Sequence, residues 1–298
     1  MDQAYKAWRL FVAFSFLILE LTLVVNAGAR EQRLVRVQTG QNMDWSQSCS
    51  DPDLSTTSAG RIIDEAMLVA KKGDIEQSRE GLSRAVSAAL EEFFAVKRLG
   101  IVICVAALQD EIGFPADAEA SLKRAISDAR VYFDESEPSD LLMPTMRLLA
   151  VADLQRLLLA HEDAAQTLAY AEGLSKSAPA SLTTFFIAIK FGQFHQLWGE
   201  TDLADESFSK ARDMIPRIST IPDSPEDQAL LSSGEVPHPA YLFAGLAQDE
   251  AAVGRSDLAN MDVSRANEIG RPHSAEVQER LVSMLAAVDR IISAVEAQ

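Results

Sequence analysis

The residue types that most often catalyse reactions or bind metals are few in this chain and widely separated. The four histidines are His161, His195, His238 and His273. None belongs to an H-E-x-x-H segment, in which two imidazoles one helical turn apart would hold zinc. The sequence also lacks a G-x-S-x-G turn and a glycine-rich phosphate loop. We therefore expect no catalytic residues, no metal site and no cofactor, and we do not expect an enzyme.

Acidic residues that lie close together in the sequence are poorly placed for chemistry. Asp110 and Glu111 are adjacent, and adjacent side chains diverge on a helix, which argues against general acid and base catalysis by this pair. Asp51 and Asp53 resemble the start of a calcium-binding loop. However, the loop lacks the glycine of its sixth position, and Ile62 stands where a bidentate glutamate belongs. This segment is better interpreted as a polar linker.

The two cysteines, Cys49 and Cys104, permit one disulfide. In an oxidising compartment such a bond would fasten the polar segment 31–58 to a helix. In the alternative interpretation, Cys104 is a small buried hydrophobe within the apolar run 101–105, and Cys49 is exposed or unpaired. The sequence leaves both alternatives open.

Residues that pack helices form a much stronger pattern than residues that do chemistry. Five times, a small residue is followed at seven positions by a helix stop, at twelve by Ala or Ser, at sixteen by a large apolar residue and at nineteen by Ala. Antiparallel helices approach closely only where the facing side chains are small, and glycine ends a helix at low cost. The pattern therefore predicts stacked helical hairpins. The five sets are Ala66-Gly73-Ser78-Leu82-Ala85, Ala106-Gly113-Ala118-Leu122-Ala125, Ala152-Leu159-Ala164-Leu168-Ala171, Gly192-Gly199-Ala204-Phe208-Ala211 and Ala247-Gly254-Ala259-Val263-Ala266.

These sets resemble tetratricopeptide repeats in a degenerate form. The fourth is nearest to the family pattern, because Pro216 falls where the terminal proline of a repeat belongs, whereas Leu159 replaces the turn glycine of the third. The usual aromatic positions are mostly lost, and the repeats are spaced more widely than the family's period of about 34 residues. The resemblance implies an all-α fold: a right-handed α-solenoid of about five antiparallel helical hairpins, with residues 275–297 as a C-terminal capping helix.

In this family the first helices of successive hairpins line a concave groove. By resemblance, that groove would bind a protein or peptide partner, whereas any single position, taken by itself, is better interpreted as an ordinary solvated residue. The positions that correspond to the groove here are Asp153, Arg156, Phe186, Gln193, Gln196 and Gln248. His195 falls on the packed side of its helix, which favours an interior histidine over a ligand.

The chain is strongly acidic, with a formal net charge of −17 at pH 7. Such a charge repels phosphate backbones, so we expect no nucleic-acid partner. It favours a soluble surface and, where it acts on binding at all, a basic partner. We expect a monomer.

The first 29 residues have the three parts of a secretory signal peptide. Lys6 and Arg9 precede the apolar stretch 10–25, and Ala27-Gly28-Ala29 provides a cleavage site. The apolar stretch would rise about 24 Å as a helix, short of the ~30 Å hydrocarbon core of a bilayer. We expect a periplasmic or secreted protein without stable membrane insertion after leader removal. The alternative is an uncleaved leader that anchors the chain in the inner membrane.

The rest of the chain divides into two parts. Residues 30–58 are predicted to form an irregular polar arm, and residues 59–298 one continuous solenoid. A long Pro-rich insertion at 216–239 interrupts the solenoid before its last repeat. Long insertions in repeat arrays are often functional, and a flexible insertion without a role is equally compatible with this composition.

Two classes of function follow from these observations. The leading hypothesis is an exported scaffold that holds a protein or peptide during cell-envelope assembly, secretion or polysaccharide export. The alternative is an enzyme or small-ligand-binding protein whose site is formed by the groove and the Pro-rich insertion. A membrane-tethered helper with a retained leader is a variant of the first hypothesis.

Removal of the leader is the first testable prediction. N-terminal sequencing of protein recovered from native cells should begin at Arg30, or at Gly28 if cleavage follows Ala27. Protein that begins at Met1 and stays in the membrane fraction would instead show that the leader is an anchor.

Overall fold

The computed structural model describes residues 54, 57–134, 140–176, 178–219, 238–270 and 275–296. Across these ranges the regular structure consists of eleven α-helices and no strands, which confirms the predicted all-α class. The helices are α2 (Ser58–Lys71), α3 (Ile75–Ala89), α4 (Ala95–Glu111), α5 (Pro115–Phe133), α6 (Leu142–Leu157), α7 (His161–Lys176), α8 (Leu182–Leu197), α9 (Thr201–Ile218), α11 (Pro239–Ala252), α12 (Ser256–Gly270) and α13 (Ala275–Glu296). The predicted leader, and the predicted arm as far as residue 53, lie outside the described residues.

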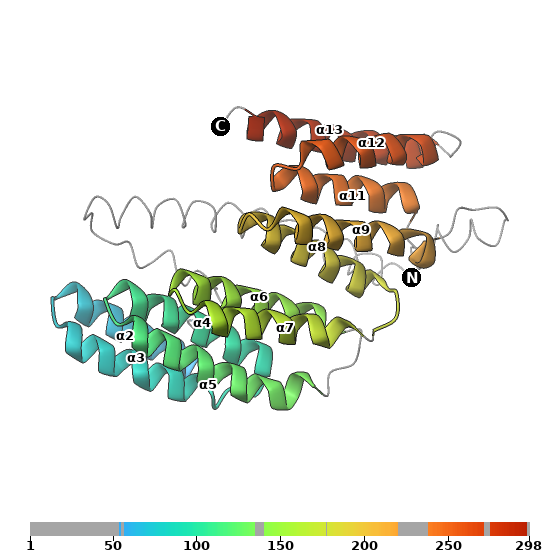
Figure 1. Cartoon of the computed structure of the whole chain (residues 1–298). Helices are drawn as coiled ribbons and strands as arrows, with labels where there is room; N and C mark the ends of the chain where they lie inside the picture. The colour runs from blue at the N-terminus through green and yellow to red at the C-terminus, as the bar shows by residue number, and fades with distance from the viewer. Residues whose placement is uncertain are drawn as a thin grey trace. The chain divides into compact units, whose positions relative to one another are not determined.

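The helices belong to two compact units. One unit contains α2 to α7, and the other contains α8 to α13. In both units, helices that follow one another in the chain pack side by side: α2 with α3, α4 with α5, α6 with α7, α8 with α9, and α11 with α12 (Figure 1). The first helices of successive pairs also contact one another, since α4 touches α2 and α6, and α11 touches α8 and α13. Continuity of one array across the two units stays a prediction.

The predicted helix stops lie at sharp left-handed turns. At each turn the N–H of the following residue donates to the carbonyl five residues back, which satisfies a carbonyl that the helix end leaves open. This hydrogen bond measures 2.8 Å from Phe114 to Gln109 and 2.9 Å from Ala160 to Gln155. The turn residues and their φ angles are Gly73 (89°), Gly113 (93°), Leu159 (63°), Gly199 (73°) and Gly254 (81°).

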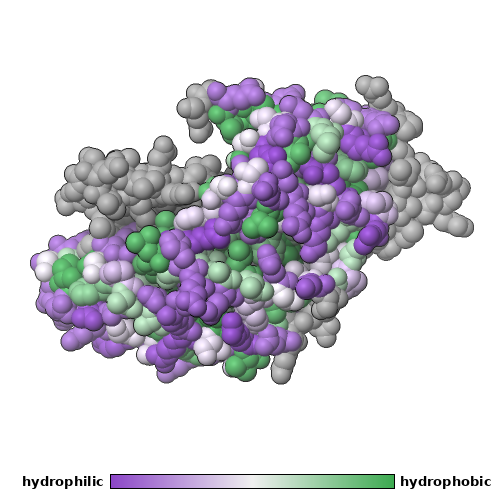
Figure 2. Space-filling model, viewed as in Figure 1, coloured by the Kyte–Doolittle hydropathy of each residue, from purple (hydrophilic) through white to green (hydrophobic). Residues whose placement is uncertain are grey.

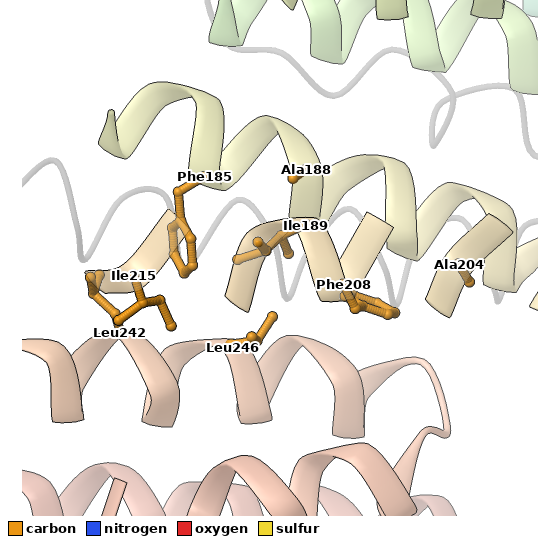
Figure 3. Close-up of a cluster of buried hydrophobic side chains, with 9 residues drawn as sticks. Phe185, Ala188, Ile189, Ala204, Phe208, Ile215, Leu242 and Leu246 are labelled. Carbon is orange, nitrogen blue, oxygen red and sulfur yellow. The ribbon is translucent and has the colours of Figure 1, made fainter. Parts of the chain in front are cut away.

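Close approach of paired helices explains the small residues of the pattern. A Cβ atom added to Gly192 on α8 would lie 2.7 Å from the Phe208 ring of α9, and one added to Gly81 on α3 would lie 2.9 Å from the Ala66 Cβ of α2. Ala204 and Ala211 are fully buried on the face of α9 that includes Phe208. The cluster in Figure 3 is shared by three helices. It joins Phe185, Ala188 and Ile189 of α8, Ala204, Phe208, Ala211 and Ile215 of α9, and Leu242 and Leu246 of α11.

The structure also modifies the predicted boundaries of the Pro-rich insertion. Helix α9 continues through Pro216 to Ile218, so the proline costs one helical hydrogen bond and only two helical residues follow it. At the other end, Pro239 begins α11, a position where a missing N–H costs nothing. Residues 220–237 lie outside the described residues.

None of the described helices has both the length and the apolar composition needed to cross a bilayer.

Replacing Leu159 by Gly should stabilise the protein. Leu159 has a positive φ, and its side chain is 77% exposed, so it carries backbone strain and recovers little packing. We expect Leu159→Gly to raise the free energy of unfolding by about 0.5–1 kcal/mol in urea titrations followed by circular dichroism.

Leu159→Ala is the matched control, because alanine removes most of the side chain and keeps the strain. A gain of equal size in both variants would assign the effect to the exposed leucine side chain and not to the turn.

Candidate functional site

Polar side chains meet inside the helix pairs at one recurring position. In α4 and α5, Gln109 accepts a hydrogen bond from the Ser121 hydroxyl at 2.8 Å. In α6 and α7, Gln155 accepts one from the Thr167 hydroxyl, also at 2.8 Å. In both pairs the partners are buried and twelve residues apart. Each glutamine follows the small residue of its set by three positions.

The last pair has two acids at the same two positions, which are Glu250 on α11 and Asp262 on α12. Glu250 is 0% exposed and Asp262 is 1% exposed. Burying two carboxylates together requires a cation or a proton, because each ionised group loses its hydration. Here the cation comes from the preceding pair.

Arg212 of α9 contacts both carboxylates. Its Nε donates to the two oxygens of Asp262 at 3.1 and 2.9 Å. Its Nη2 donates to Oε1 of Glu250. One guanidinium therefore joins three helices, and we call Arg212, Glu250 and Asp262 the Arg212 cluster.

Burial disfavours ionisation of both acids in the cluster. Burial, and then the charge of Asp262, raise the pKa of Glu250 to about 9, although Arg212 acts in the opposite direction. Burial also raises the pKa of Asp262, again opposed by Arg212. Both shifts favour a neutral carboxyl within the cluster at neutral pH.

A second buried network lies between α8 and α11. Lys190 Nζ donates to Gln193 Oε1 at 2.9 Å, and Gln193 Nε2 donates to Asp249 Oδ1 at 2.6 Å. Burial lowers the pKa of Lys190 and raises that of Asp249, and the two charges oppose these shifts. Adjacent residues of α11 therefore contact different helices. Asp249 faces α8, and Glu250 faces α9 and α12.

Gln193 consequently lies elsewhere than predicted. Its side chain is only 4% exposed, because α11 packs against α8 and Asp249 accepts a hydrogen bond from the Gln193 amide. It is an interior bridge in this structure and not a surface position of a groove.

The other predicted groove residues are half-buried, and they are divided between the two units. Asp153 and Arg156 lie on α6 in one unit. Gln196 and Gln248 lie in the other unit, where Gln248 Nε2 donates to the Met284 carbonyl of α13 at 3.2 Å. The Gln196 Oε1 atom is shielded from solvent and has no hydrogen-bond partner among the described residues.

The predicted aromatic position and histidine are parts of the packing. Phe186 packs edge-on against Phe185, with ring centroids 5.4 Å apart, beside the core of Figure 3. His195 is buried, and its Nδ1 lies 2.7 Å from Oε2 of Glu200. The prediction of an interior histidine is confirmed.

The structure describes one of the two cysteines. Cys104 is buried on α4, and no described cysteine is a free thiol. Cys49 lies outside the described residues, so a disulfide between Cys49 and Cys104 stays a prediction.

Within the described ranges, no three His, Cys, Asp or Glu side chains gather as a metal site would require.

Two further features were missed in the sequence. Ion pairs connect second helices of successive pairs: Arg79 with Asp117 at 2.5 Å, and Lys123 with Asp163 at 3.0 Å. Asp117 and Asp163 occupy the same position of their sets, eleven residues after the small residue, and this repetition was the available signal.

The second missed feature is an aromatic pair at the junction of α3 and α4. Phe93 is 85% exposed and packs edge-on against Phe94, with ring centroids 5.0 Å apart. Hydrophilic residues dominate the face shown in Figure 2, and hydrophobic residues form small separate groups on it. An adjacent pair of phenylalanines at a helix boundary was the signal for this feature.

Comparisons with known proteins returned no match of any kind. No protein-family model matches the chain, no curated protein is detectably similar in sequence, and no solved structure resembles it significantly.

The buried role of Gln193 gives a direct test. Gln193→Ala should lower the free energy of unfolding by about 1–3 kcal/mol, because Lys190 and Asp249 both lose a buried hydrogen bond. Urea denaturation at neutral pH measures this change.

Gln196→Ala, one turn further along α8, is the control and should cost less, since the Oε1 of Gln196 lacks a partner among the described residues. Equal losses in the two variants would contradict the bridging role.

Proposed function

We propose that this chain is an exported, non-enzymatic scaffold that binds a protein or peptide partner. In this proposal it is a degenerate tetratricopeptide-like solenoid, right-handed, with about five hairpins and α13 as the C-terminal cap. The left-handed turn at the stop position of every set supports the repeat assignment. Export rests on the leader pattern of residues 1–29.

The observation that carries the proposal is the contact between first helices. Within one unit α4 packs against both α2 and α6, and within the other α11 packs against both α8 and α13. Helices arranged in this way present their outward side chains as one surface, on which an extended chain can form many modest contacts without a deep pocket.

The position of Gln193 changes which residues are the best candidates for contact. Gln193 and Asp249 satisfy each other inside the second unit, so they are unsuited to hold a partner. Asp153 and Arg156 remain half-exposed on α6, three residues apart and on the same side of the helix. Their side chains have opposite charges and are partly accessible to a partner. The acidic surface as a whole would attract a basic partner more rapidly at low salt.

The binding surface can be tested in native cells by photo-crosslinking. A photoreactive phenylalanine analogue at Asp153 should form adducts with a discrete partner, identified by mass spectrometry. Arg156→Ala should then reduce the adduct yield about tenfold, the effect of losing about 1.4 kcal/mol from one charge-assisted contact.

Arg124→Ala is the matched control, because Arg124 is an exposed arginine on the second helix α5 of the same unit. Circular dichroism must show unchanged helicity in both variants. Equal adduct yields for Arg156→Ala and Arg124→Ala would place the contact surface away from α6.

A further inference from the structure

The buried charges around α11 do not balance. Three carboxylates, Asp249, Glu250 and Asp262, are at most 5% exposed, and they face two cations, Lys190 and Arg212. One excess negative charge in this interior would lack a counter-ion, so the geometry requires one proton among the three acids.

Glu250 is the acid with the least support for a negative charge. Asp262 receives two hydrogen bonds from Arg212, and Asp249 receives one from Gln193 with Lys190 beside it. Glu250 receives a single one, to Oε1. Its Oε2 is buried and accepts no hydrogen bond from the described residues, although a protonated Glu250 forms a hydrogen bond with Asp262. A neutral acid tolerates such an unsatisfied oxygen at much lower cost than a carboxylate.

We propose that the Arg212 cluster is a proton-dependent clamp, in which a proton on Glu250 holds the α11–α12 pair against α9 and its loss loosens that contact. The inference concerns the stability of this contact and does not depend on any partner of the protein.

Charged groups lie on every element packed against α11, and two of them act on Glu250. Helix α9 contributes Arg212, and α12 contributes Asp262. Helix α8 directs Lys190 and Gln193 at the neighbouring Asp249. From α13, the Arg280 guanidinium lies over the Tyr241 ring. In the following turn, Arg255 pairs with Asp205 and Asp257. Asp262 and Arg212 are thus the charges that act directly on Glu250.

The direction of the pH dependence follows from the raised pKa of Glu250. In the unfolded chain this carboxyl ionises near its ordinary value of 4.5, whereas in the folded protein it ionises at about 9. Between these values the folded state binds more protons, so stability is complete at low pH and declines as pH rises. The local opening constant should increase by up to about tenfold per pH unit across this range.

The experiment compares wild type with Glu250→Gln by hydrogen exchange and thermal melting at about pH 5.5, 7 and 8.5. An amide at this position needs no proton, and glutamine already occupies it in two other pairs, at Gln109 and Gln155. At about pH 5.5 the two proteins should show similar α11–α12 opening. At about pH 8.5 the opening constant of wild type should exceed that of the variant by at least about tenfold, with a lower Tm.

Glu206→Gln is the matched control, since Glu206 is an exposed glutamate of α9 in the same unit. It should leave the wild-type pH profile unchanged. Asp262→Asn provides a second variant if Glu250→Gln does not fold. Removing the charge of Asp262 lowers the pKa of Glu250, so the pH dependence should shrink. A difference in opening between wild type and Glu250→Gln that is the same at about pH 5.5 and 8.5 would overturn the proposal.

Discussion

Close contact between the two helices of each pair is the constraint on which the rest of this structure depends. The helices approach so closely that a single methyl group at Gly192 would overlap the Phe208 ring. Such proximity excludes large side chains from the seam and leaves alanine, glycine and serine as its main residues. It also brings buried polar atoms within reach of each other, so the few polar side chains in the seam must pair. The recurring contacts of Gln109 with Ser121, and of Gln155 with Thr167, are the result.

The same constraint explains why the buried acids of the last pair require a cation from the preceding pair. With Glu250 and Asp262 at the seam positions, a pair cannot satisfy its own polar groups, and α9 supplies Arg212. The contact between successive pairs is therefore electrostatic at this point, in addition to the apolar cluster formed by α8, α9 and α11 (Figure 3). In the other unit the seam pairs are neutral, and ion pairs such as Arg79 with Asp117 connect second helices at partly exposed positions.

The sequence predicted the helical class, the turn positions and the residues of the seam, because these follow from local spacing. Even Leu159, which breaks the glycine pattern, was placed correctly at a turn, and its φ is positive like that of the glycines. The groove stays a prediction, although Gln193 is buried. Gln193 was assigned to a surface by its position in the repeat. Its burial, however, depends on the residue of the next helix pair that packs against α8. Asp249 lies 56 residues further along the chain, and no local pattern encodes that partnership. For the same reason, Arg212 and Glu250 were not identified from the sequence.

The sequence distances of these contacts also bear on the order of folding. The hydrogen bonds from Ser121 and Thr167 each close a segment of only twelve residues, whereas those from Arg212 reach 38 residues to Glu250 and 50 residues to Asp262. Short segments close rapidly and at small entropic cost, and long ones close later. Each helix pair should thus assemble first as a local unit, and the guanidinium of Arg212 should find its two carboxylates only when finished pairs meet. Burial of that arginine would mark the last step of folding in the second unit.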